Sequence, residues 1–286
     1  MRSPDSADPT ILAFPNAASA VEPGFDLTVI VPAYNEAARL PRALDGLAAW
    51  CLAQDRSIEV LVVDDGSTDA TARAAAAHPI NCGVIRLRCN SGKGAAVRTG
   101  MLVGQGRIIA FTDADLPYDL AALCWGCDVI DAGIADVVYG ARDLDGSVQA
   151  VERTAARSIA SACFRTVASH LVSRDVRDTQ CGLKVFRQDA ARDIFSRVQT
   201  DGFAFDAEAI LVARRRGYAA ARVPVRLVNE AGSTVSLRRH APAMLRDIVV
   251  ARLRHGMHAG PASAQLPDHD TVRVAAEPFR PSRQAA

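Results

Sequence analysis

The chain has 286 residues, of which 49% are hydrophobic and 23% charged, an ordinary composition for a globular protein. Its formal net charge is +1, so no overall field favours nucleic acid as a partner. No apolar run approaches the ~20 residues of a membrane span, and the first residues lack the pattern of a signal peptide. Seven cysteines without framework spacing fit a reducing cytoplasm.

The two ends of the chain differ in composition from the middle. Residues 1–25 are rich in Pro, Ala, Ser and Asp, and residues 259–286 gather Pro, Ala and Gln, without a sustained period in either. We expect disordered tails there, with one folded domain between them.

Apolar runs of strand length alternate with helical segments in this central part. The predicted strands are 27–31, 59–63, 84–87, 107–111 and 136–139. The predicted helices are 36–53, 69–77 (capped by Ser67 or Thr68), 92–105 and 119–132. This βαβα rhythm predicts an α/β fold with a mainly parallel central sheet and helices on both faces.

Polar clusters follow four of these strands, at the carboxyl ends where parallel sheets gather their ligands. They are Pro32–Glu36, Asp64–Asp69, Asp113–Asp115 and Gly140–Arg142. We expect them to lie on one rim of the sheet.

Asp113 and Asp115 carry the most specific chemistry of the four clusters. They lie two apart at the end of an extended run, so both carboxylates can aim at one point. Hard oxygen ligands of this kind suit Mg²⁺ or Mn²⁺ that also binds phosphate oxygens. By themselves, the two residues are a weak signal, and solvated loop acids are the simpler interpretation.

Two other loops suggest a nucleotide. In Asp64-Asp65-Gly66-Ser67 a carboxylate can accept a hydrogen bond from a base or a ribose hydroxyl, although these are also turn and cap residues. Asn90-Ser-Gly-Lys-Gly94 precedes a predicted helix, where the glycines permit close backbone approach and Lys93 can meet a phosphate. A plain glycine turn is the alternative there, and the spacing is not that of a Walker loop.

Together these segments resemble the inverting GT-A glycosyltransferases of family 2, and among them the polyprenyl-phosphate sugar synthases, with the dolichyl-phosphate β-glucosyltransferases as the nearest subgroup. The resemblance is carried by VPAYNE (31–36), VVDDGSTD (62–69), NSGKGAAVRTGM (90–101), TDADLPYDL (112–120), VVYGAR (137–142), RDTQCGLKVFR (177–187), DGFAFDAE (201–208) and VPV (223–225).

The resemblance implies a Rossmann-like GT-A domain over 26–258, with a donor half at about 26–142 and an acceptor half at about 143–258. It also implies roles for individual residues. The nucleotide sugar is expected to contact Pro32, Tyr34, Glu36, Asp64, Asp65, Lys93 and Asp113. Asp113 and Asp115 are expected to hold the metal, with Asp115 taking part in catalysis. The loop over 178–182 is expected beside the donor sugar, with Gln180 and Lys184 binding substrate.

The reaction implied is a single displacement that moves glucose from UDP-glucose to a polyprenyl (dolichyl-type) phosphate. Arg142, together with Arg153 or Arg157, is a candidate to bind the acceptor phosphate. That phosphate is already anionic near neutral pH, so a strong general base is less necessary than for a sugar hydroxyl. If a base acts, Asp206 or Glu208 is the candidate, and at most one should face the site because they diverge on a helix.

Two helical segments in the second half bear on the acceptor. Residues 151–172 form a predicted helix that either packs in the core or walls a lipid-phosphate channel. Residues 238–255 combine an apolar stripe with several arginines, which suits either an anionic membrane surface or packing on the domain. We expect a cytoplasmic protein held at the inner face of the membrane by this helix or by a membrane partner.

Cys124 and Cys127 form a C-x-x-C pair, but the pair lies inside a predicted helix. We interpret them as buried thiols, since a zinc site would need more ligands, such as Cys82 and Cys89.

Other functions stay open at this point. GDP-mannose could replace UDP-glucose, and the acceptor could be soluble. A nucleotidyltransferase is disfavoured because PAYNE (32–36) stands where a Gly-rich, Arg-containing loop would follow the first strand. A non-catalytic nucleotide-sugar-binding module is disfavoured by the intact Asp113 and Asp115.

Overall fold

The computed structural model describes residues 25–142, 144, 147, 181–228 and 237–256. The predicted helix over 151–172 lies outside these ranges, as do the predicted tails, Phe25 excepted.

A seven-stranded sheet, of order β3-β2-β1-β4-β6-β5-β7, forms the centre of a single α/β domain. Its strands are β1 (Leu27–Ala33), β2 (Ile58–Asp64), β3 (Gly83–Arg86), β4 (Ile108–Phe111), β5 (Val137–Ala141), β6 (Lys184–Arg187) and β7 (Ala220–Pro224). Among these described strands only β6 is antiparallel to its neighbours, β4 and β5. The predicted mainly parallel sheet is therefore confirmed, and β6 is an addition that the sequence pattern did not predict.

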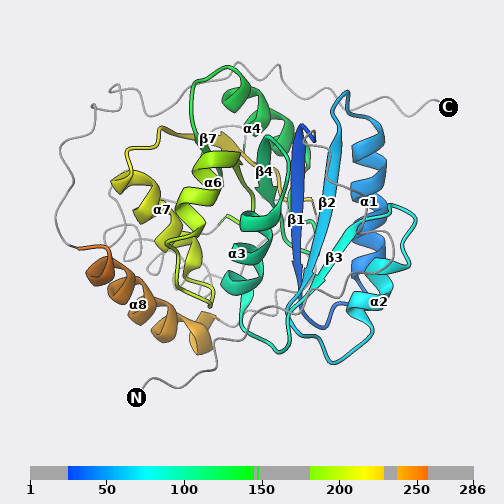
Figure 1. Ribbon diagram of the computed structural model, residues 1–286, viewed down its shortest axis with the longest axis horizontal. Coiled ribbons are helices and arrows are strands. Elements are labelled where there is room, and N and C mark those ends of the chain that lie inside the picture. The colour runs from blue at the N-terminus through cyan, green and yellow to red at the C-terminus, as the bar shows by residue number, and fades with distance from the viewer. Residues whose placement is uncertain (1–24, 143, 145–146, 148–180, 229–236, 257–286) are drawn as a thin grey trace.

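Helices cover both faces of this sheet (Figure 1). The helices are α1 (Leu40–Leu52), α2 (Thr71–Ala76), α3 (Lys93–Val103), α4 (Ala121–Asp131), α6 (Gln188–Phe195), α7 (Phe205–Arg215) and α8 (Leu237–Arg254). One apolar cluster joins the sheet to α3, α6 and α7, with α8 packed outside α7, and the other cluster joins the opposite face to α1, α2 and α4.

Strand β1 shows why the sheet is buried on both sides. All seven of its residues are buried. Ile30 belongs to the α3 side, whereas Val29 and Val31 belong to the α1 side, as the two-residue period of a strand requires. A continuous apolar run thus gives a strand with helices on both faces.

The start of α2 differs from the prediction that Ser67 or Thr68 caps this helix. The helix begins at Thr71, and the carboxylate of Asp69 accepts a hydrogen bond from the Thr71 amide at 2.9 Å. Ser67 and Thr68 do not cap it, because they bond instead to Asn35 in the loop after β1.

Candidate functional site at the carboxyl rim of the sheet

The carboxyl ends of β2, β1 and β4 lie side by side, since β1 pairs with both of the others. Ala33 is in register with Asp64, and Ile30 with Phe111. The loops that follow these three strands therefore meet on one rim, which confirms their expected proximity.

The loop after β1 is tied to the loop after β2 and to the start of α2 by hydrogen bonds from main-chain amides to side-chain oxygens. The Asn35 amide donates to Ser67 Oγ, the Thr68 amide donates to Asn35 Oδ1, both at 2.9 Å, and the Glu36 amide donates to Thr71 Oγ1 at 2.8 Å. Asn35 adopts a left-handed conformation with φ of 54°, which asparagine tolerates better than most residues. The two loops thus form one fixed surface.

Among the residues expected around the nucleotide, Tyr34 is the most open. Its relative exposure is 42%, whereas Pro32 is buried at the end of β1. The Glu36 carboxylate forms a two-point ion pair with Arg39, at 2.6 and 2.7 Å. The ring of Tyr34 is therefore free to stack on a planar ligand, and Glu36 is held in one orientation.

Asp64 and Asp65 are both buried, and their carboxylates bind the protein itself. Asp64 Oδ1 accepts the Ser67 amide at 3.0 Å, and Arg86 Nε lies 3.2 Å from Oδ2 without hydrogen-bond geometry. Asp65 accepts the amides of Ser91 and Gly92, both at 2.8 Å. Burial raises the pKa of Asp65, against the effect of these two amides. A ligand hydroxyl would have to share oxygens that already organise the loop before α3.

The amino end of α3 is occupied by the chain itself. The amides of Gly94 and Ala95 donate to the Asp201 carbonyl at 2.7 and 3.3 Å. A Cβ at position 94 would lie 2.3 Å from the Thr200 carbonyl oxygen. The close backbone approach expected at these glycines is real, but the segment that approaches is 200–201. It takes the amides of Gly94 and Ala95, and the Lys93 side chain is the candidate group for a phosphate.

Lys93 and Asp113 form an ion pair on this rim, with Asp115 nearby. Burial opposes the charged form of Lys93, but the carboxylates of Asp113, Asp206 and Asp115 outweigh it and raise its pKa. Burial and the neighbouring Asp113 raise the pKa of Asp115. The predicted metal-binding carboxylates therefore lie in an anionic site that already attracts one cation.

Gly182 lies against Asp113, a contact that the sequence does not predict. A Cβ at this position would lie 2.0 Å from Asp113 Oδ2. The absence of a side chain thus lets the segment before β6 reach the carboxylate. A glycine two residues before an apolar strand was the available sign, but its partner is 69 positions earlier in the chain.

Lys184, which is expected to bind substrate, does not reach the surface. Its relative exposure is 1%, and its ammonium donates to the Cys181 carbonyl at 2.8 Å and to Asp206 Oδ1 at 2.7 Å, above the Phe111 ring. A direct contact with substrate would require breaking this buried pair. Lys184 is instead the internal counter-ion of Asp206.

Asp206 and Glu208 point in different directions, as expected from their spacing on α7. Burial raises the pKa of Asp206, and the ammonium groups of Lys184 and Lys93 oppose this shift. Asp206 therefore interacts electrostatically with Lys93 on the rim. Glu208 is fully buried and accepts bonds from the amides at 199 and 200 and from Arg254 and His255. It is not available as a base at the rim.

The remaining acceptor candidates are only partly described. Arg142 is half-buried just after β5. Arg153, Arg157 and Gln180 lie outside the described residues, so their roles stay predictions.

Cys124 and Cys127 lie in α4, as expected. Cys124 Sγ donates to Gln54 Oε1 at 3.2 Å, and burial raises the pKa of Cys127 to about 12. Within the described ranges, no group of three or more His, Cys, Asp or Glu side chains is arranged for a metal. Both cysteines lie in a helix as expected, but the expected burial is confirmed for Cys127 alone, since Cys124 is half-buried.

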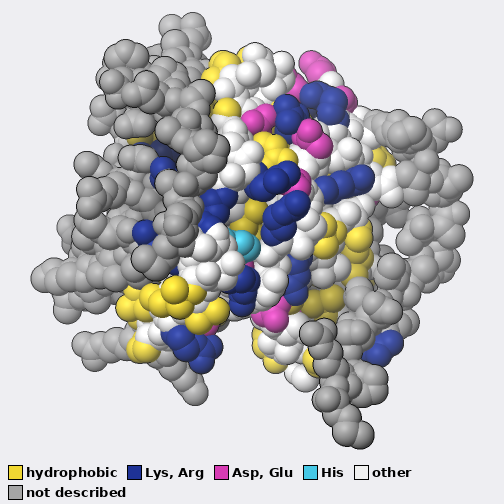
Figure 2. Space-filling model, turned by 60° about the vertical axis from the view of Figure 1, so that its left-hand side comes forward, with side chains coloured by type: hydrophobic (Ala, Val, Ile, Leu, Met, Phe, Trp, Pro, Cys, Tyr) yellow, Lys and Arg dark blue, Asp and Glu magenta, His cyan; other side chains and the backbone are white. Residues whose placement is uncertain are grey.

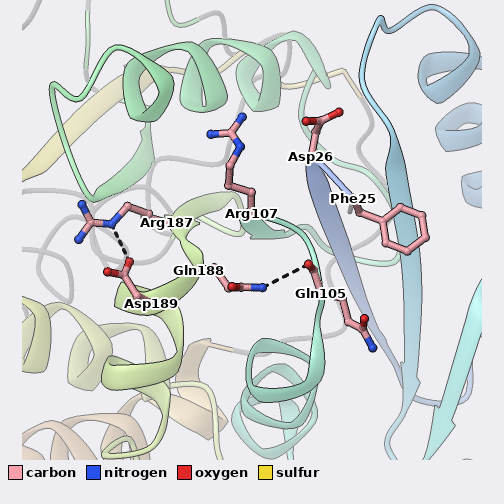
Figure 3. Close-up of a pocket in the computed structure, with 7 residues that line it drawn as sticks. All are labelled: Phe25, Asp26, Gln105, Arg107, Arg187, Gln188 and Asp189. Atoms are coloured by element: carbon pink, nitrogen blue, oxygen red, sulfur yellow. Dashed lines mark hydrogen bonds and ion pairs between the residues drawn. The ribbon is translucent and has the colours of Figure 1, made fainter. Parts of the chain in front are cut away.

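A cavity of about 500 Å³ lies at the opposite edge of the sheet, near the amino ends of β1 and β4 (Figure 3). Its arginines already bond carboxylates of the protein: Arg187 Nε bonds Asp189 at 2.6 Å within the cavity, and Arg107 bonds Asp131, which lies outside it. The cavity lacks the chemistry of the carboxyl rim.

Comparison with known proteins agrees with this fold and rim. Residues 28–195 match the family model described as Glycosyl transferase family 2. A dolichyl-phosphate beta-glucosyltransferase of Drosophila melanogaster is 32% identical over 252 residues, which is 82% of this chain and 76% of that protein. One of Dictyostelium discoideum is 31% identical over 243 residues, 80% of this chain and 74% of its own length.

Solved structures of glucosyl-3-phosphoglycerate synthase from Mycobacterium tuberculosis share the fold. The complex with Mn²⁺, UDP and glucosyl-3-phosphoglycerate superposes with a TM-score of 0.60 at 19% identity, over 84% of this chain and 82% of that chain. The complex with Mn²⁺ and UDP-glucose gives 0.57 at 18% identity, over 84% and 81%.

Proposed function

The chain belongs to glycosyl transferase family 2, and we propose that this hexosyltransferase moves glucose from UDP-glucose to the phosphate of a polyprenyl lipid. The single observation that carries the proposal is the charge arrangement on the rim, where Lys93, Asp113 and Asp115 lie beside the exposed Tyr34 loop. The names of the curated relatives support the glucose donor and the lipid phosphate.

The donor set fits a divalent cation. Asp113 and Asp115 are hard oxygen donors, and the Asp113 carboxylate already pairs with one cationic group, the Lys93 ammonium. A bound Mg²⁺ or Mn²⁺ would offset the charge that grows on the diphosphate leaving group. Structures of the fold neighbours were solved with Mn²⁺ or Mg²⁺ and UDP, which supports the same choice here.

The remaining rim residues would bind the nucleotide. The Tyr34 ring would stack on the base, and the loop held by Asp65 would contact the ribose. Lys93 would turn from Asp113 to the diphosphate once metal binds. With these contacts, the anomeric carbon of the sugar would face the part of the rim where we propose that the acceptor phosphate binds.

The reaction forms one bond and breaks one. A phosphate oxygen of the acceptor attacks the anomeric carbon as the bond from that carbon to UDP breaks, which inverts the anomer and releases UDP. Arg142, Arg153 and Arg157 would hold the acceptor phosphate, since guanidinium groups bind phosphate at two points. Asp206 would stay paired with Lys184 and orient the site rather than remove a proton.

The outer face of α8 offers a surface for a membrane. Within the described residues no helix is long and apolar enough to cross a bilayer. On α8, however, Val249, Val250 and Leu253 are 41%, 42% and 62% exposed beside the exposed Arg246. Figure 2, in which the side of the molecule that carries α8 comes forward, shows hydrophobic side chains next to Lys and Arg side chains. We propose that this face binds anionic lipid, which would bring the rim near a lipid-linked phosphate.

A transfer assay tests the proposed reaction. Purified protein is given radiolabelled UDP-glucose, polyprenyl phosphate, detergent and Mn²⁺, and label is counted in the organic phase. We expect chelator-sensitive transfer that Asp113→Asn abolishes, while Asp128→Asn, which alters an exposed carboxylate on α4, leaves it unchanged. Label from GDP-mannose alone would change the sugar, and transfer only to 3-phosphoglycerate would move the acceptor to the soluble class of the fold neighbours.

A vesicle assay tests the α8 surface. We expect sedimentation with vesicles containing phosphatidylglycerol but not with phosphatidylcholine alone, because arginines border the apolar face. Leu253→Asp should release the protein, whereas Leu52→Asp, at an 88% exposed leucine on α1, should not. Equal sedimentation of both variants would refute this surface.

A further inference from the structure

We infer that Glu208 is a positioning residue for the donor site: through the segment 199–201 it holds the start of α3, and so Lys93, against Asp113. This inference rests on the proposed function for the meaning of the rim, but not for the contacts that carry it. Glu208 itself does not touch the rim.

Glu208 joins three separate parts of the chain. It is fully buried on α7, where Oε2 accepts the amides of Gln199 and Thr200 at 3.0 and 2.7 Å. Oε1 accepts Arg254 Nη1 at 2.8 Å and faces His255 Nε2 at 2.7 Å, both from the end of α8. Burial alone would raise the pKa of Glu208, but the bonds from Thr200, His255 and Arg254 outweigh it and lower the pKa. One carboxylate therefore fixes the segment 199–200 between α7 and α8.

The same segment continues directly to the start of α3. The Asp201 carbonyl accepts the amides of Gly94 and Ala95, and the Asp201 carboxylate pairs with Arg98 Nη2 at 2.6 Å. The fit is close on both sides of Lys93. A Cβ at Gly92 would lie 2.4 Å from the Asp201 carbonyl oxygen, and one at Gly94 would lie 2.3 Å from that of Thr200.

Lys93 stands between those two glycines and is the residue that pairs with Asp113. A displacement of residues 199–201 must therefore displace the first turn of α3, and with it the backbone that carries the Lys93 side chain. The path from Glu208 to the rim consists of two hydrogen-bonded steps and one side chain. A buried carboxylate that only joined α7 to α8 would not need the two amides of 199 and 200.

The experiment uses the full chain and two readouts. Glu208→Ala removes both sets of bonds, and Glu208→Gln keeps an acceptor oxygen for part of them. Arg254→Ala removes one of the two partners at the end of α8. Arg216→Ala is its matched control, since it deletes an exposed arginine that pairs with Asp193. Hydrogen exchange measures protection of the Gly94 and Ala95 amides, and calorimetry measures the affinity for UDP with MnCl₂.

We expect Glu208→Ala to expose both amides to exchange and to weaken UDP binding roughly 5-fold or more, the size of a typical coupling between sites. Glu208→Gln should recover part of each loss, Arg254→Ala should show a smaller loss of the same kind, and Arg216→Ala should show none. If Glu208→Ala does not fold, Arg254→Ala with its control decides the question.

Folded Glu208→Ala with wild-type amide protection and wild-type UDP affinity would overturn the inference. So would equal losses in Arg254→Ala and Arg216→Ala. If the wild-type protein does not bind UDP, the proposed function fails instead, and the exchange measurement still decides whether Glu208 controls the start of α3.

Discussion

Replacing Gly182 by alanine should damage the metal site while leaving the fold intact. The added Cβ would lie 2.0 Å from Asp113 Oδ2 and 2.6 Å from its Cγ. Real Cβ atoms essentially never approach closer than 3.0 Å, so the contact must open by at least 1.0 Å. The carboxylate is the end of a flexible, partly exposed side chain, and turning it away costs the fold little. The shift therefore falls on the orientation of Asp113.

A misplacement of about 1 Å at a reacting site can cost on the order of 100-fold in rate. We therefore expect kcat/KM of Gly182→Ala to fall about 100-fold, which corresponds to about 2.7 kcal/mol of transition-state stabilisation. The assay measures transfer from UDP-glucose over a range of Mn²⁺ concentrations, and higher Mn²⁺ should recover part of the rate. Thermal unfolding without metal should stay close to that of the wild type.

Gly46→Ala is the matched control, because its Cβ would meet only Leu116 Cδ1 at an ordinary 3.6 Å. It should transfer sugar at the wild-type rate. Wild-type kcat/KM and wild-type Mn²⁺ dependence in Gly182→Ala would refute the reasoning, since Asp113 would then tolerate a displaced carboxylate. Loss of cooperative unfolding would show that Gly182 serves the fold instead.

Three further substitutions test the charges of the rim. Asp115→Asn should raise the metal-free melting temperature near neutral pH. Burial and Asp113 raise the pKa of Asp115 above its unfolded value, so its charge opposes folding as pH rises above about 4. An unchanged or lower melting temperature would contradict this. Lys184→Met should cost about 3–5 kcal/mol in urea unfolding by leaving Asp206 unpaired, and Lys184→Met with Asp206→Leu should recover most of that loss; equal losses in the single and double variants would argue against the pair. Asp65→Ala should cost about 1–3 kcal/mol by removing the acceptor of two amides, and calorimetry should show weaker UDP binding; unchanged affinity would separate this carboxylate from the nucleotide.

Local patterns in the sequence were sufficient to predict the rim. The runs around Val29, Val62 and Ile109 are apolar because parallel strands are buried on both faces, so each reads directly as a strand. Since parallel strands end on the same edge, the polar residues after them had to meet. The loop of Tyr34 and the loop of Asp113 and Asp115 therefore follow adjacent strands on the same rim, as predicted.

The second half of the sheet depended on contacts that local patterns do not contain. Strand β6 has four residues, begins with a charged Lys184, and inserts antiparallel between β4 and β5. Whether such a lysine faces solvent or the interior depends on Asp206, 22 residues later. The family resemblance predicted that Lys184 binds substrate, but only the tertiary pairing shows that its ammonium is bonded to another side chain.

The start of α3 shows that a motif, like a single residue, can depend on tertiary contacts that the local sequence does not reveal. A glycine-rich turn before a helix has open amides whenever nothing else in the chain approaches it, and sequence alone does not reveal an approach by Thr200 and Asp201. Because the Asp201 carbonyl accepts the amides of Gly94 and Ala95, the Lys93 side chain is the group of this turn that could reach a phosphate. That residue pairs with Asp113, so in this rim the group that would receive the diphosphate and the group that would receive the metal neutralise each other until both ligands arrive. Such an arrangement favours binding the metal and the diphosphate together over binding either one alone.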